Sequence, residues 1–130
     1  MATEARSPEL DAFLDNAVKP EDFHHADHVR VAFEILRRCD FAEAALAYSA
    51  GVKRIAARAG DPGAYHATIT IAFLSLIAER NATAAYRDYA AFAHANGDLL
   101  DKSVLSKWYA PERLASPIAR KTFVLPQARR

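Results

Sequence analysis

The chain has few of the residues that build disulfide-linked, turn-rich or phosphate-loop proteins. It contains one cysteine, Cys39, and four glycines among its 130 residues. A lone cysteine cannot form an internal disulfide, so nothing in the sequence argues for an oxidising compartment. The scarcity of glycine is typical of helices rather than of an all-β domain. The sequence also lacks a glycine-rich phosphate loop, a G-x-S-x-G motif and paired cysteines, which argues against the usual nucleotide, serine-hydrolase and iron-sulfur chemistries.

A charge excess and a long apolar run are missing as well. The chain has 17 Lys and Arg against 16 Asp and Glu, so the basic excess of a nucleic-acid-binding domain is absent. The longest nearly apolar run, residues 67–78, would span about 18 Å as a helix, well short of the roughly 30 Å hydrocarbon layer. The N-terminal segment has no apolar signal-peptide core. We therefore expect a soluble, cytoplasmic protein with neither a nucleic-acid nor a membrane partner.

The residues that are present predict an all-α fold. An apolar content of 52% in 130 residues is enough for one core, and we expect a single helical domain over 1–130. Helical periodicity predicts a bundle of five to six helices, and Ser7 and Asp40 are the expected N-caps of two of them. We place them at about 8–18, 24–38, 41–59, 64–80, 83–95 and 103–109.

Two parts of the chain depart from the ordinary amphipathic pattern. The helix at about 64–80 is apolar nearly all round, which predicts a central buried helix. The tail at about 110–130 contains Pro111, Pro117 and Pro126, which divide it into short, partly irregular pieces. Enough apolar residues remain between the prolines for this tail to pack back onto the bundle.

The five histidines are the side chains most suggestive of a site. His24, His25 and His28 begin the second predicted helix, His66 begins the fourth, and His94 lies near the end of the fifth. Short loops favour antiparallel neighbours, so the second and fourth helices should run parallel and start at one end of the bundle. We therefore expect the histidines to converge there.

The spacing of these histidines suits a metal ion. Residues three or four apart share a helix face, so His28 can pair with either His25 or His24, and spacing alone does not choose. His66 would complete the set from the neighbouring helix. Neutral imidazole binds zinc, iron and copper. The sequence thus suggests a divalent transition metal held by His25, His28 and His66.

Three further residues are candidates for binding a small-molecule substrate. Thr70 lies one turn beyond His66, Tyr65 precedes that histidine and could also orient an imidazole, and Arg120 lies in the apolar tail, where it would pair with a buried carboxylate or a substrate anion. The sequence identifies no catalytic residue. Metal-free acid-base chemistry by His28 or His66 with Asp27 is an alternative, because imidazole titrates near neutrality.

A non-enzymatic role stays open beside these. A histidine in the first turn of a helix is often only a polar side chain that packs on one side and is exposed to solvent on the other. In that case the protein would be a helical interaction domain, for example a homodimer formed through aromatic surface around Trp108 and Tyr109.

Three motifs, at 23–32, 65–70 and 119–126, follow the patterns F-x-H-x-x-H-[LV]-x-[VL]-A, Y-H-x-T-[IV]-T and A-R-x-x-[FV]-[VL]-x-P. In these motifs the chain resembles a group of small, uncharacterised bacterial helical proteins. The resemblance implies a shared helical fold and draws attention to His25, His28, His66, Thr70 and Arg120. The resemblance names no reaction. In the group, the histidine of the second motif is often followed by an acidic residue, whereas this chain has Ala67 at that position.

Overall fold

The computed structural model describes residues 5–127. These residues form an all-α bundle with no strand, which confirms the predicted fold class. The α-helices are α1 (Pro8–Leu14), α2 (His25–Leu36), α3 (Phe41–Arg58), α4 (Ala67–Thr83), α5 (Tyr89–Ala95), α6 (Pro111–Ala115) and α7 (Pro117–Lys121). Short 3-10 segments lie between them: η1 (Pro20–Asp22), η2 (Pro62–Ala64), η3 (Gly97–Leu100) and η4 (Lys102–Lys107).

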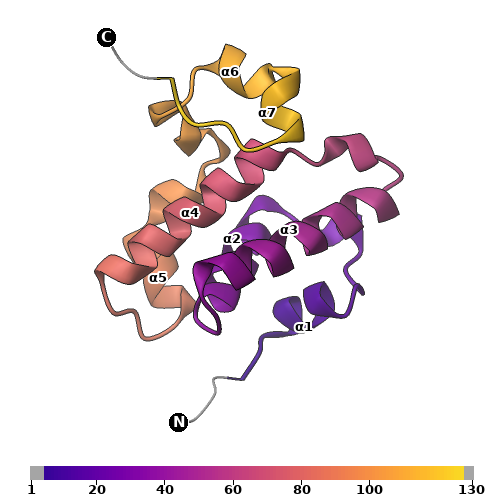
Figure 1. Cartoon of the computed structure of the whole chain (residues 1–130). Coiled ribbons are helices and arrows are strands. Elements are labelled where there is room, and N and C mark those ends of the chain that lie inside the picture. Colours follow the sequence, from indigo (N-terminus) through magenta and orange to yellow (C-terminus); the bar gives the residue numbers. More distant parts are fainter. Residues whose placement is uncertain (1–4, 128–130) are drawn as a thin grey trace.

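Helix α4 is the central element of the bundle. It contacts α2 and α3 along its length and α7 near its beginning, and Figure 1 shows α6 and α7 gathered over that end. Leu74 and Ile77 in its middle are almost completely buried. The sequence correctly predicts this central position. The helix begins three residues later than expected because Pro62–Ala64 form a 3-10 turn and His66 caps the first turn.

Capping residues set the beginnings of α1 and α3 as the sequence predicts. The Ser7 hydroxyl accepts the Leu10 N–H, and the Asp40 carboxylate accepts the Glu43 N–H. Helix α1 is shorter than expected, however. It ends at Leu14, and Asn16 takes up a left-handed conformation with φ of 55°.

The second half of the chain differs more from the prediction. Helix α4 runs on to Thr83, and α5 begins only at Tyr89, where Asp88 caps it. The expected helix at 103–109 is a 3-10 segment. Between its prolines the tail forms α6 and α7, each beginning with a proline at the first helical position.

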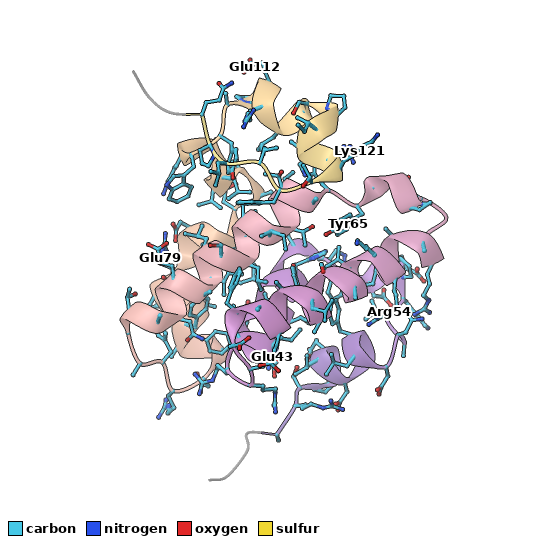
Figure 2. The ribbon with its side chains drawn as sticks, in the orientation of Figure 1. Glu43, Arg54, Tyr65, Glu79, Glu112 and Lys121 are labelled. Atoms are coloured by element: carbon cyan, nitrogen blue, oxygen red, sulfur yellow. The ribbon has the colours of Figure 1, made fainter. Side chains whose placement is uncertain are left out.

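The described part of the tail packs against the bundle through Ala119 and Val124, both buried. Tyr109 is buried too, and its hydroxyl donates to the Val124 carbonyl at 2.8 Å. Charged side chains project outward, as Glu43, Glu79, Glu112 and Lys121 do in Figure 2. Across residues 5–127, every helix is too short or too polar to traverse a lipid bilayer.

Candidate functional site

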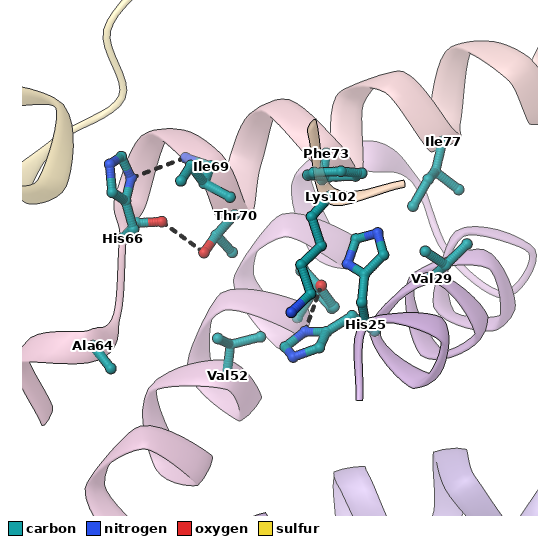
Figure 3. A pocket seen from close by; sticks show the side chains of 12 residues that line it. His25, Val29, Val52, Ala64, His66, Ile69, Thr70, Phe73, Ile77 and Lys102 are labelled. Carbon is teal, nitrogen blue, oxygen red and sulfur yellow. Dashed lines mark hydrogen bonds between the residues drawn. The ribbon is translucent and has the colours of Figure 1, made fainter. Parts of the chain in front are cut away.

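A cavity of about 320 Å³ lies between α2, α3 and α4, with η4 at its mouth (Figure 3). The polar side chains that line it are His25 and His28 from α2, Tyr48 from α3, Thr70 from α4 and Lys102 from η4, with His66, the residue before α4, at its edge. Its apolar wall is formed by Val29, Val52, Ile69, Phe73 and Ile77. A concave, mostly apolar cavity with a few convergent polar groups is the usual form of a small-molecule site.

His25 is the first residue of α2 and is fixed by two contacts. Its Nε2–H donates to the Leu99 carbonyl at 2.9 Å, and its ring packs edge-on against Phe73 with the centroids 5.0 Å apart. Because a carbonyl can only accept, Nε2 carries the proton. In the neutral ring Nδ1 therefore holds a lone pair, and no group among residues 5–127 hydrogen-bonds to it.

His28 lies one turn further along α2 and has the opposite protonation pattern. Its Nδ1 is 3.2 Å from the hydroxyl of Tyr48, which is buried. Burial raises the pKa of Tyr48, so the phenol keeps its proton, and it has no other hydrogen-bond partner in the described part of the chain. Tyr48 therefore donates to Nδ1, and neutral His28 carries its proton on Nε2.

The electrostatic surroundings keep His28 neutral. Burial, followed by the nearby His25, lowers its pKa from 6.5 to about 4, against the opposing effect of Asp27, and Lys102 lowers it further. The ring also packs edge-on against Phe23, with a centroid distance of 4.4 Å. At neutral pH this imidazole thus serves as an uncharged hydrogen-bond donor.

Lys102 brings a positive charge to the same place from outside the main helices. It lies in η4 and lines the cavity together with His25 and His28, and Figure 3 shows its side chain extending into the cavity. The neighbouring Asp101 carboxylate is occupied with the backbone N–H and hydroxyl of Ser103. Lys102 makes no ion pair with any of residues 5–127.

The structure does not bring His66 to the other two histidines. His66 is the N-cap of α4: its Nδ1 accepts the Ile69 N–H at 3.1 Å and its Nε2–H donates to the Leu114 carbonyl at 2.7 Å. Both ring nitrogens are therefore engaged. Figure 3 shows the ring turned away from the cavity, which His66 borders at its edge.

The physical reason is a stagger between α2 and α4. The two helices start from the same side, as expected, but His25 lies beside Phe73, seven positions after His66. Seven residues of α-helix correspond to roughly 10 Å. Within the described residues no three His, Cys, Asp or Glu side chains are grouped to hold a metal ion.

The remaining predicted site residues are divided between cavity and surroundings. Thr70 lines the cavity, and its hydroxyl donates to the His66 carbonyl at 2.7 Å. Tyr65 does not line the cavity; its ring lies beside α3, with the Lys53 ammonium 5.0 Å from the ring centroid, and Figure 2 shows it near the start of α4. Burial raises the Tyr65 pKa, and hydrogen bonds with Thr70 and Ser49 oppose that effect. Arg120 lies outside the cavity and donates to the Gly63 carbonyl at 2.7 Å, so it joins α7 to η2.

The last two histidines lie outside the cavity. His24 is the exposed N-cap of α2 and borders only a separate hollow, which it shares with His25, His28 and Lys102. His94 is exposed in the last turn of α5. The choice that sequence spacing leaves open between His24 and His25 is thus resolved for the cavity in favour of His25.

No protein-family model, curated protein or solved structure matches the chain.

Sequence reasoning missed Tyr48 and Lys102. Tyr48 lies on the apolar face of α3, and a buried tyrosine hydroxyl needs a hydrogen-bond partner. The histidines of the neighbouring helix α2 could have been considered as that partner. Lys102 follows a turn without helical periodicity, so no pattern links it to α2.

Proposed function

We propose that the cavity is the active site of a small-molecule enzyme that uses histidine acid-base chemistry, with His25 as general base and His28 as hydrogen-bond donor. One observation carries the proposal: the two imidazoles line one cavity with complementary unused nitrogens, Nδ1 of His25 as acceptor and Nε2–H of His28 as donor. A base beside a neutral donor is the arrangement needed to remove a proton next to a carbonyl.

The reaction that fits these groups is proton transfer at a carbon adjacent to a carbonyl. His25 Nδ1 takes the proton, and the electron pair of the broken C–H bond becomes the C=C bond of an enolate. The carbonyl π pair moves to oxygen, where the His28 Nε2–H stabilises the charge. Return of the proton from His25 to the same or a neighbouring carbon completes an exchange or an isomerisation.

Tyr48 is a positioning residue in this scheme. Its hydroxyl occupies His28 Nδ1 and thereby selects the tautomer that presents Nε2–H. Tyr48→Phe should free Nδ1 and mix the tautomers. A ¹⁵N-detected ring spectrum would report that change independently of activity.

The experiment is deuterium wash-in from D₂O, followed by NMR, with a panel of small ketones and 2-oxo acids. We expect exchange above the buffer rate for at least one compound and loss of that exchange in His25→Gln. The glutamine amide still donates to the Leu99 carbonyl but cannot accept a proton at neutral pH. The matched control is His94→Gln, which changes an exposed histidine outside the cavity.

Two results would overturn the proposal. One is the absence of exchange above the buffer rate for every compound that binds the cavity. The other is equal exchange in His25→Gln and the wild type.

The metal-dependent form of the hypothesis has less geometric support. His66 would have to give up the Ile69 cap and the Leu114 contact to join His25 and His28. A bound cation would also lie near the Lys102 ammonium. Metal content of the wild type and of His25→Gln after addition of zinc, iron or copper separates the two forms, since only a metal enzyme should lose stoichiometric metal in the variant.

A second candidate function is the non-enzymatic homodimer. Trp108 is 45% exposed, and Ile118 and Leu125 in the tail are 57% and 69% exposed, which gives this end of the molecule an apolar surface. Tyr109 is not part of it, because its side chain is buried under the tail. A molar mass that rises with concentration in sedimentation equilibrium, and that falls in Ile118→Lys, is the result that this alternative requires.

A further inference from the structure

We propose that the natural ligand of the cavity is an amphipathic monocarboxylate of about ten non-hydrogen atoms, with its carboxylate at Lys102 and its apolar body between α2 and α4. This inference rests on the proposed function for the site but names a ligand class that acid-base chemistry alone does not fix.

The charge of the lining selects an anion. Among residues 5–127, Lys102 is the one side chain lining the cavity that carries a permanent charge, and no Asp or Glu of that range lines it. Because the ammonium has no ion-pair partner among residues 5–127, a ligand carboxylate would not have to displace a protein carboxylate. The site would bind a cation poorly, since the same ammonium already contributes to the lowered pKa of His28.

The rest of the lining selects the body of the ligand. Val29, Val52, Phe73 and Ile77 present hydrocarbon with no hydrogen-bonding capacity. A volume of about 320 Å³ corresponds to roughly ten water-sized groups at about 30 Å³ each. A short acid with a branched or aromatic side chain fits both this volume and this apolar lining. A sugar or a nucleotide would leave its polar groups without hydrogen-bond partners against the apolar wall.

The test is a titration of the full chain with 4-methylpentanoate, 4-methylpentanamide and 4-methylpentylamine, observed through the ring signals of His25 and His28. These probes share one apolar body and differ in charge. We expect the acid to bind at least tenfold more tightly than the amide and the amine to bind most weakly. Lys102→Met should weaken binding of the acid at least tenfold and leave the amide unchanged, and Lys102→Arg should retain most of the affinity.

The matched control is Lys107→Met, which removes the same charge from the same 3-10 segment but outside the cavity. Equal binding of acid and amide, or equal affinities in Lys102→Met and the wild type, would overturn the inference. A cavity-filling variant, Val52→Phe, should weaken all three probes, and an unchanged affinity there would place the ligand elsewhere.

Failure of this inference can be told apart from failure of the proposed function. The probes carry no ketone, so their binding does not depend on proton transfer. Charge-selective binding without deuterium wash-in would support the proposed ligand class and contradict the proposed enzymatic activity. Deuterium wash-in into neutral ketones, without preferential binding of acids, would support the enzymatic activity and contradict the proposed ligand class.

Discussion

The ring of Phe13 in α1 lies against the bare Cα of Gly51 in α3. A Cβ built at Gly51 would be 2.2 Å from Phe13 Cζ and 2.3 Å from its Cε1. The ring is 2% exposed and stacks on Phe23 and Tyr48, so it has little room to move. Gly51 is therefore what allows α1 to pack closely on α3, behind the tyrosine that positions His28.

Gly51→Ala should lower the free energy of unfolding by about 1–3 kcal/mol, because overpacking a filled core outweighs the better helix propensity of alanine. Urea denaturation measures this. Gly97→Ala is the control, since apart from Gly97 and its two chain neighbours no described residue has an atom within 4 Å of the added Cβ. Phe13→Leu should lower the free energy of unfolding less in the Gly51→Ala background than in the wild type. A Gly51→Ala variant as stable as the wild type would contradict this account of the packing.

His66→Ala should destabilise the protein by about 1–2 kcal/mol and loosen the tail. The substitution removes the cap on the Ile69 N–H and the donor to the Leu114 carbonyl. Hydrogen exchange followed by mass spectrometry should show faster exchange in residues 111–124 and at the start of α4. His24→Ala, at the exposed N-cap of α2, is the control and should leave both segments protected.

The pKa of His28 makes stability depend on pH in a defined window. Its folded-state pKa of about 4 lies below the unfolded value of 6.5, so between these values the unfolded chain binds more protons. Stability from this residue is therefore full above pH 6.5 and falls as the pH drops toward 4. Moving a pKa from 6.5 to about 4 corresponds to roughly 3 kcal/mol.

His28→Asn isolates this effect, because the asparagine oxygen can still accept from Tyr48 but does not titrate. The difference in unfolding free energy between wild type and variant should change by up to about 3 kcal/mol between pH 6.5 and 4. Parallel pH profiles for the two proteins would show that His28 is not held neutral.

The ion pair between Arg80 and Asp98 also makes stability depend on pH, in a more acidic range than His28 does. Both guanidinium Nη atoms reach the carboxylate, at 3.0 and 2.8 Å, and the hydrogen bond from Arg80 lowers the pKa of Asp98 to about 2. Its contribution is present above about pH 4 and is lost as the pH falls toward 2. Asp98 is 36% exposed, so solvent screening limits the effect to about 1 kcal/mol or less.

Asp98→Asn should therefore reduce stability at pH 7 and have a much smaller effect near pH 2, as measured by thermal unfolding at both pH values. Glu21→Gln serves as the control, since this exposed carboxylate makes no ion pair within residues 5–127. An Asp98→Asn effect that is the same at both pH values would contradict the assigned pKa.

The helices and their caps were accessible from sequence because they depend on neighbours within one or two turns. Ser7 and Asp40 cap as expected, and the uniform apolarity around Leu74 gave the position of α4. The direction of α2 and α4 followed from loop length. Their axial offset did not, because it depends on how Phe73 packs against His25, and this offset separates His66 from the site.

Contacts between distant segments were inaccessible for the same reason. Glu34 lies within an apolar stretch of α2, is 9% exposed, and accepts hydrogen bonds from the Ser7 backbone and hydroxyl, 27 residues away. Tyr48 and Lys102 meet His28 in the same way, through tertiary packing. A pattern that repeats along one helix carries no information about such partners.

The tail contacts of α4 have a consequence for the order in which the protein matures. His66 Nε2 and the buried Thr68 hydroxyl find their partners at Leu114, Thr122 and Val124, 48 to 56 residues later in the chain. While the protein is being synthesised, these hydrogen bonds at the beginning of its central helix therefore cannot form until residues 114–124 have left the ribosome. The first turns of α4, which form part of the cavity wall, gain these contacts only after that point, so the candidate site is supported by residues synthesised after all of those that line it.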